Sequence, residues 1–255
     1  MRYEVTGTTM QTVSVDLAQG ESLYSQTASM AWMSPSIRMD THTGGGIFAG
    51  IKRALAGGGI FITEFTAQGS GHIAFAPRFP GQIVPVTLAS GQSLICRKET
   101  FLCAEKSVTL EIAFQQRLGA GFFAGEGFIM QKVTGPGTVF LDLSGEVIEK
   151  TLASGEQLLV HAGHVGMQEP SVQIDIQMMR GFRNVLFGGE GLFLATLTGP
   201  GKIWLQSMPI MNLAEEIGRY LPLGEGAGGS TGSLLGAGMA ATAVGGILGS
   251  IMGDN

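Results

Sequence analysis

Two histidines and two cysteines are the residues of this chain whose types and spacing could do chemistry. His161 and His164 are separated by two residues, a spacing that suits two ligands of one metal ion. Cys96 and Cys103 could supply a nucleophilic thiol, which needs a neighbouring base to become reactive. A structural zinc site takes four ligands, and no further ligand cluster stands at suitable spacing in the sequence. We therefore expect no metal, no cofactor and no catalytic residue.

The elements that position these four residues repeat along the chain. Residues 125–130 read Gly-Glu-Gly-Phe-Ile-Met, residues 189–194 read Gly-Glu-Gly-Leu-Phe-Leu, and residues 57–62 hold a degraded copy. Gly-Pro-Gly turns follow at 135–137 and 199–201, where Pro fixes one φ and Gly permits a positive one. Repetition of this kind predicts that the chain is built from similar modules.

The repeat also serves as an internal comparison for the candidate residues. One repeat apart, the matching positions are Cys96 with Val160, Cys103 with Met167, Arg97 with His161, and Thr100 with His164. The cysteines match apolar residues, so we predict that they are small core side chains. The histidines match residues of other kinds, so the repeated module does not require a metal ligand at either position.

The pattern within each copy predicts an all-β fold. Residues 37–41, 108–112 and 172–176 alternate apolar and polar side chains, which is typical of strands with one buried face. Short strands separated by regular turns indicate a barrel, roll or prism. We place three tandem β-modules around a pseudo-threefold axis, where they share one core. Their limits are 1–76, 77–142 and 143–207, with a Gly-rich arm at 44–56, a short helix or linker at 208–223 and a Gly-rich apolar tail at 224–255.

Composition narrows the classes of partner. Of 255 residues only 14% are charged, and the formal net charge of −5 argues against a nucleic-acid surface, which needs clustered Lys and Arg. The first residues have no apolar core of the signal-peptide type. Two cysteines do not form a disulfide framework, so a reducing, cytoplasmic location is expected.

Several stretches together resemble one known family. They are Lys-Arg-Ala-Leu at 52–55, Thr-Glu-Phe at 63–65, residues 74–83 and the later Gly-Glu-Gly and Thr-Gly-Pro-Gly elements. This combination resembles the altered-inheritance-of-mitochondria family of mitochondrial biogenesis proteins. The resemblance implies β-roll modules similar to the tryptophan-RNA-binding attenuation protein (TRAP), three in one chain. It also implies no catalytic residues, and the fungal relative is linked to inner-membrane organisation. Gly58 departs from the glutamate usual in the first turn.

Segments outside the repeat are the predicted interaction surfaces. Apolar side chains before each Gly-rich turn either cover the ends of the barrel or form a binding face. The tail carries small residues at every fourth position, and it is disordered, packed as helices in an oligomer, or inserted in a membrane. The candidate interaction residues are Phe48, Ile51, Leu55, Phe122, Phe123, Phe182, Phe187, Ala237, Ala241, Gly245 and Gly249.

These observations favour a non-enzymatic scaffold or assembly protein. We expect a homo-oligomer that contacts a membrane through its tail and is peripheral to the inner membrane. The alternative is a small-ligand or RNA-binding TRAP-like module that uses clefts between repeats. An enzyme that uses His161, His164 or the cysteines is the weakest interpretation.

Overall fold

The predicted all-β class is confirmed by the structure, a computed structural model. It describes residues 1–26, 29–42, 62–116, 127–179, 192–210, 212–213 and 216–217. The described strands are β1 (Arg2–Thr6), β2 (Thr12–Leu17), β3 (Ser22–Gln26), β4 (Met30–Met33), β5 (Ile37–His42), β6 (Ile62–Ala67), β7 (Gly71–Phe75), β8 (Gly81–Leu88), β9 (Ser93–Arg97), β10 (Phe101–Glu105), β11 (Thr109–Gln116), β12 (Phe128–Thr134), β13 (Gly137–Ser144), β14 (Val147–Leu152), β15 (Gln157–His161), β16 (Val165–Gln168), β17 (Gln173–Met179), β18 (Leu192–Thr198) and β19 (Gly201–Gln206). Two single 3-10 turns, η2 (Lys98–Thr100) and η4 (Ala162–His164), interrupt them.

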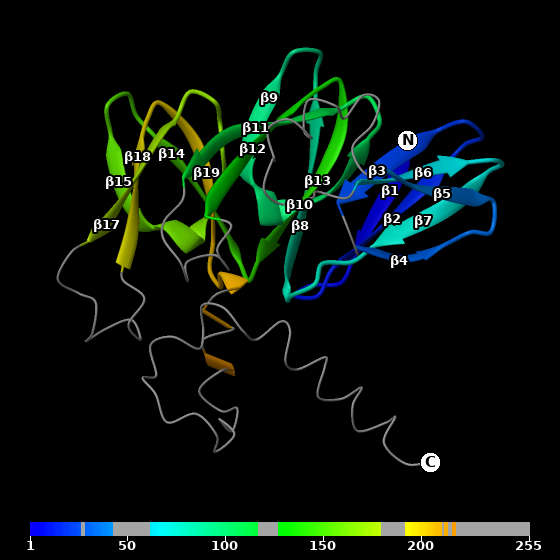
Figure 1. The fold of residues 1–255 in the computed structure, drawn as a ribbon, viewed down its shortest axis with the longest axis horizontal. Helices are drawn as coiled ribbons and strands as arrows, with labels where there is room; N and C mark the ends of the chain where they lie inside the picture. Colours follow the sequence, from blue (N-terminus) through cyan, green and yellow to red (C-terminus); the bar gives the residue numbers. More distant parts are fainter. Residues whose placement is uncertain are drawn as a thin grey trace, which may run out of the picture.

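The described strands form four antiparallel sheets, and none closes into a barrel. The strand orders are β1-β2-β7-β4, β5-β6-β3-β10-β13-β8, β11-β12-β9-β16-β19-β14 and β15-β18-β17. The sheets form a row of overlapping layers along the long axis of the molecule. Strands β5, β6 and β3 pack on the four-stranded sheet, and the three-stranded sheet packs on β14 and β19 (Figure 1). Strand β15 lies near one end and β4 near the other. Each sheet therefore keeps two open edges within the described part of the chain.

One order of strands recurs along this row. Adding six to each strand number of the first six-stranded sheet gives the order of the second. The four-stranded sheet contains the corresponding segment β2-β7-β4, and the three-stranded sheet contains β15-β18-β17. Two pairings, β3 with β10 and β9 with β16, join strands that otherwise belong to separate groups.

Local sequence explains the strand ends. The turn between β12 and β13 holds Gly137 at φ 132, and that between β18 and β19 holds Gly201 at φ 141. A Cβ on Gly137 would lie 2.7 Å from Ser107 Oγ, so both the conformation and the space require glycine there. The Gly-Pro-Gly positions are turns, as the sequence predicted, but they are not hairpins. Strand β12 pairs with β11 and β9, whereas β13 pairs with β10 and β8, so the turn leads the chain from one sheet to another. The same holds for β18 and β19.

The core lies between the sheets, in three clusters. Apolar residues of alternating strand positions fill it, among them Leu23, Phe75, Phe140 and Leu197, each fully buried. This alternation produces strands with one core face, because successive side chains point to opposite sides of a sheet. Cys96 and Cys103 belong to the core clusters too, which confirms that they pack as small apolar residues.

Part of the segment predicted as a short helix or linker, 208–223, is described. Asn212 is helical there, and its N–H donates to Pro209 O at 3.0 Å. The helical turn therefore begins before Asn212.

All eleven candidate interaction residues, the arm at 44–56 and the tail at 224–255 lie outside the described residues. Over the described ranges, no helix has the length and apolar character to cross a membrane.

Candidate functional site

A cleft of about 370 Å³ opens where the end of β3, the turn η2 and the ends of β13 and β19 meet. Its walls hold both cationic and anionic side chains. The lining residues are Gln26, Ser29, Ala76, Pro77, Arg78, Phe79, Arg97, Lys98, Glu99, Thr100, Phe101, Leu102, Asp142, Ser144, Gln206 and Ile210. We treat it as the candidate site because charged groups gather in a concave surface there.

Arg97 anchors one wall of the cleft at the end of β9. Its side chain is only 3% exposed, and its Nη1 donates to Gly163 O at 3.1 Å while its Nε pairs with Glu99 Oε2 at 3.1 Å. Its guanidinium also lies 5.3 Å from the centre of the Phe128 ring. A buried guanidinium held by a carboxylate, a carbonyl and a ring has little freedom, so Arg97 is a structural tie across the cleft wall.

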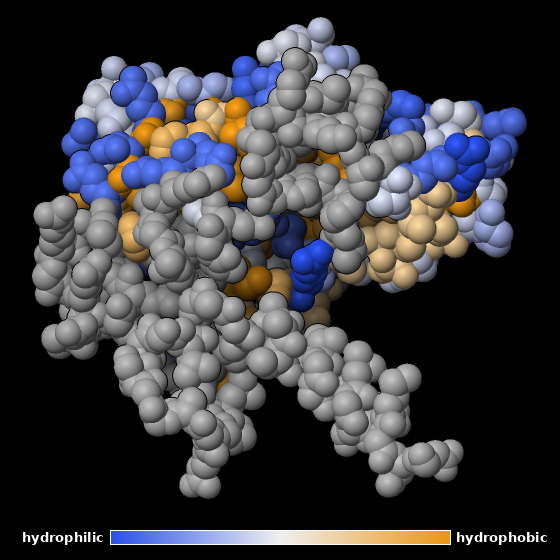
Figure 2. All heavy atoms as spheres, in the orientation of Figure 1, coloured by the Kyte–Doolittle hydropathy of each residue, from blue (hydrophilic) through white to orange (hydrophobic). Residues whose placement is uncertain are grey.

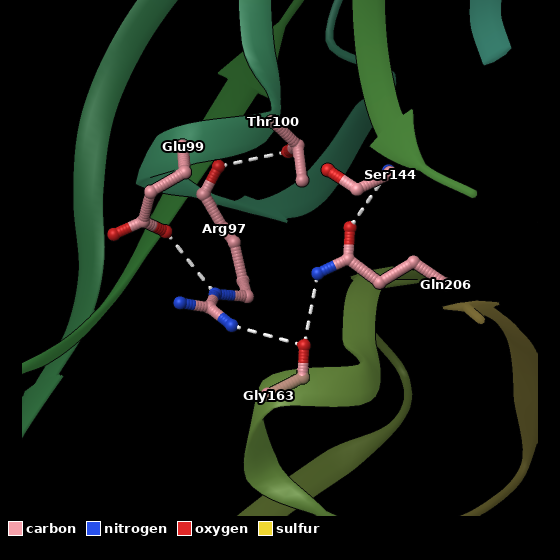
Figure 3. A network of polar contacts seen from close by, with 6 residues as sticks. All are labelled: Arg97, Glu99, Thr100, Ser144, Gly163 and Gln206. Atoms are coloured by element: carbon pink, nitrogen blue, oxygen red, sulfur yellow. Dashed lines mark hydrogen bonds and ion pairs between the residues drawn. The ribbon is translucent and has the colours of Figure 1, made fainter. Parts of the chain in front are cut away.

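Gln206 completes this tie from β19. Its Nε2 donates to the same Gly163 carbonyl at 2.9 Å, and its Oε1 accepts from the Ser144 N–H at 3.0 Å. Figure 3 shows Arg97 and Gln206, from two different strands, converging on the Gly163 carbonyl. The network therefore fixes η4 against the ends of β9, β13 and β19.

Asp142 is the titratable group of the cleft whose burial matters most. It lies on β13, and its Oδ1 is buried without a hydrogen-bond partner. Burial raises the pKa of this carboxyl from 3.8 to about 7, because a low-dielectric environment disfavours the charged form. Near neutral pH the group therefore exchanges between its neutral and charged forms, and it can donate or accept a hydrogen bond.

The structure places the two histidines next to each other. Their rings lie 5.7 Å apart between centroids, and His164 Nδ1 is 2.8 Å from Gln206 O. Burial, followed by the charges of His164 and Arg97, lowers the pKa of His161. Among the residues that the structure describes, no group of three or more His, Cys, Asp or Glu is placed to hold a metal ion.

The cysteines have the properties of core thiols. Both are fully buried, and burial raises the pKa of Cys96 to about 12 and that of Cys103 well above its usual value. A thiol with a raised pKa stays protonated at neutral pH, so neither is an activated nucleophile.

Sequence reasoning missed the residues that form the cleft network. Arg97 entered only as the counterpart of His161, and Asp142 and Gln206 were not considered. A usable signal existed, because each is a polar residue within an apolar strand: Asp142 interrupts Phe-Leu-Asp-Leu, and Gln206 ends Ile-Trp-Leu-Gln. Polar groups in such positions are normally paired or functional.

Fold and cleft together define an all-β protein of antiparallel sheets with a buried polar network at a sheet junction. The chain belongs to the Mitochondrial biogenesis AIM24 family, whose sequence model matches residues 3–208. This confirms the resemblance stated above. An uncharacterised protein of Streptococcus pyogenes serotype M6 is 30% identical over 218 residues, covering 82% of this chain and 86% of that protein. A crystal structure of a Streptococcus pyogenes protein superposes with a TM-score of 0.69 at 28% identity, covering 86% of this chain and 99% of that one.

Proposed function

We propose that this chain is a non-enzymatic assembly protein built from three TRAP-like β-modules. Each module comprises six strands: β2 to β7, β8 to β13 and β14 to β19. Their ends lie close to the limits 1–76, 77–142 and 143–207 predicted from the sequence, although β13 runs on to Ser144 and β1 precedes the first six. The observation that carries the proposal is the recurrence of one strand order at an interval of six strands. The modules form an open row in place of a closed prism, which leaves a sheet edge at each end (Figure 1).

The contacts between modules suit a rigid scaffold. Main-chain pairing joins β3 to β10 and β9 to β16. Buried polar groups add to each junction: Tyr24 Oη donates to Val108 O at 3.1 Å across the first, and Arg97 donates to Gly163 O across the second. Continuous sheets with buried hydrogen bonds resist relative motion of their parts, so the row is expected to act as one body.

Light scattering after size-exclusion chromatography tests the proposal. The full chain is expected to elute as assemblies of several chains, with a mass that rises with concentration. A single-chain mass at every concentration would contradict the assembly role.

The tail is proposed to contact membranes. It is uncharged from 226 to 253 and long enough to span a bilayer if helical. The full chain is expected to partition onto liposomes, and a chain ending at Leu223 is expected to lose that partitioning. Equal partitioning of the two chains would show that the tail does not mediate membrane contact.

A second candidate function is binding of a small polar ligand in the cleft. The unpartnered Oδ1 of Asp142 favours it, because a buried carboxyl oxygen without a hydrogen bond gains by meeting a donor. A thermal shift caused by small amines in the wild type, but absent in Asp142→Asn, would support this function, and identical shifts in both would count against it.

A further inference from the structure

The two ends of the row carry unlike strand edges. Strand β4 ends the four-stranded sheet and β15 ends the three-stranded sheet, so each has only one described neighbour, β7 and β18 respectively. Figure 1 shows the two strands at opposite ends of the molecule, too far apart to meet within one chain. Each edge presents main-chain N–H and C=O groups that a further strand can pair with.

The two internal junctions show which strand suits each edge. In the first junction Cys103 of β10 lies opposite Ser25 of β3. In the second, Met167 of β16 lies opposite Cys96 of β9. These junctions are the same by repeat position. The strands that correspond to β10 and β9 but have no such neighbour among the described strands are β4 and β15. A third junction would place Trp32 opposite Val160 and Met33 opposite Leu159.

Backbone irregularities support this alignment. The ladder of β10 shifts register between Phe101 and Cys103, and that of β16 shifts between Val165 and Met167. Strand β4 shifts between Met30 and Trp32. The three strands therefore share one bulge at one position, and β4 has the same edge geometry as the two strands that already form junctions.

Burial differs between filled and unfilled junctions at matching positions. Trp32 is 50% exposed, whereas its counterparts Cys103 and Met167 are fully buried. Leu159 is 63% exposed, whereas its counterparts Ile95 and Tyr24 are partly and fully buried. Apolar spheres cover the part of the surface where β4 lies (Figure 2). Trp32 and Leu159 are therefore exposed at positions that a neighbouring module covers in the internal junctions.

Charge patterning points the same way. The other six strands that end the described sheets each carry a charged residue or a proline, which discourages pairing with other chains. These residues are Arg2 and Glu4 in β1, Arg38 and Asp40 in β5, Pro85 in β8, Glu111 in β11, Glu149 and Lys150 in β14, and Asp175 in β17. Strands β4 and β15 read Met-Ala-Trp-Met and Gln-Leu-Leu-Val-His, with neither acidic side chain, lysine, arginine nor proline.

A polar residue at the β15 end occupies the position of a junction contact. His161 holds the repeat position of Gln26 and Arg97. Gln26 Nε2 donates to Gln131 Oε1 at 3.2 Å across the first junction, and Arg97 donates to Gly163 O across the second. The imidazole of His161 therefore stands where each internal junction has a side chain that bonds to the next module.

We propose that β4 of one chain pairs antiparallel with β15 of a second copy of this chain, in the register Trp32 to Val160 and Met33 to Leu159. This inference rests on the proposed assembly function and names its interface. The contact uses different surfaces on the two partners, so it repeats head to tail and yields a ring if the rotation closes or a filament if it does not.

Two single substitutions block one end each. Trp32→Lys places a charge on β4 and leaves β15 intact, whereas Leu159→Lys blocks β15 and leaves β4 intact. Each variant alone is expected to be a single chain by light scattering, with association weakened about a hundredfold or more, because a lysine must be buried to pair. An equal mixture is expected to form a two-chain species, since one variant offers β4 and the other β15.

The outcomes separate this inference from the broader function. If the wild type assembles and both lysine variants assemble equally well, the interface is wrong but the assembly role stands. If Trp32→Lys alone still forms dimers, β15 pairs with itself and the head-to-tail arrangement is wrong. If the wild type is a single chain, the assembly role and the proposed interface are both wrong.

Ile148→Lys, an equal change at a side chain 42% exposed on β14, is the matched control and should assemble as the wild type does. Should a lysine variant fail to fold by circular dichroism, the glutamine variant at that position takes its place in the same mixture, with the same outcomes.

Discussion

Replacing Asp142 with asparagine is expected to stabilise the folded chain above neutral pH and to leave its stability nearly unchanged in mild acid. Burial raises the pKa of Asp142 from 3.8 to about 7. Between these values the folded chain holds a proton that the unfolded chain has released, so the wild type loses stability as pH rises through this window. Above pH 7 the whole cost is present, and it amounts to at most about 4 kcal/mol.

Chemical denaturation measures this effect. The free energy of unfolding should fall for the wild type between about pH 4 and about pH 8, and should fall much less for Asp142→Asn. Asp16→Asn is the matched control, because Asp16 is exposed on β2, and it should follow the wild-type curve. Parallel curves for wild type and Asp142→Asn would show that the buried carboxyl has no raised pKa.

Arg97→Ala is expected to lower the free energy of unfolding by about 2–4 kcal/mol, since it removes a buried charge with its hydrogen bonds. The variant loses the bond to Gly163 O, the pair with Glu99 and the contact over the Phe128 ring. Arg97→Lys should recover only part of the loss, because an ammonium cannot present the two donors in the planar arrangement of a guanidinium.

An exposed ion pair supplies the control for Arg97. Arg38 pairs with Asp40, and the two side chains are 64% and 33% exposed. Arg38→Ala should cost no more than about 0.5 kcal/mol, as is usual for surface pairs. Equal losses for Arg97→Ala and Arg38→Ala would show that the network does not stabilise the junction.

Much of the fold could be predicted because it depends on local pattern. Alternation of apolar residues identified strands such as β11 and β17, and the Gly-Pro-Gly triplets identified the turns before β13 and β19. Comparison between repeats correctly placed Cys96 and Cys103 in the core, since a position that accepts Val160 or Met167 must be apolar.

The arrangement of the sheets could not be predicted in the same way. Alternation shows which face of a strand is buried but carries no information about which distant strand lies beside it. The pairing of β3 with β10 joins residues far apart in the chain, and nothing in either strand alone indicates it. A closed arrangement around an axis and an open row require the same alternation of apolar residues. The sequence pattern therefore does not distinguish the predicted closed arrangement from an open row.

The candidate site was missed for a related reason. The cleft depends on Arg97, Asp142 and Gln206, which belong to separate strands and meet only through the sheet junction. Histidines and cysteines stand out in a sequence because their side chains are reactive. The buried polar residues of the cleft appear in it only as interruptions of apolar strands. The interaction residues chosen from the sequence lie outside the described residues and stay predictions.

Disulfide trapping tests the end-to-end contact most directly. Residues opposite one another on antiparallel strands have Cα atoms about 4.5–5.5 Å apart, which suits a disulfide. The double variant Met33→Cys, Leu159→Cys should therefore give, on oxidation, a ladder of cross-linked chains on a non-reducing gel. Native Cys96 and Cys103 are fully buried and should not contribute. The matched control, Met39→Cys with Leu159→Cys, should give no ladder, because Met39 lies on β5. Absence of the ladder at concentrations where the chain assembles, or an equal ladder in the control, would contradict the pairing of β4 with β15.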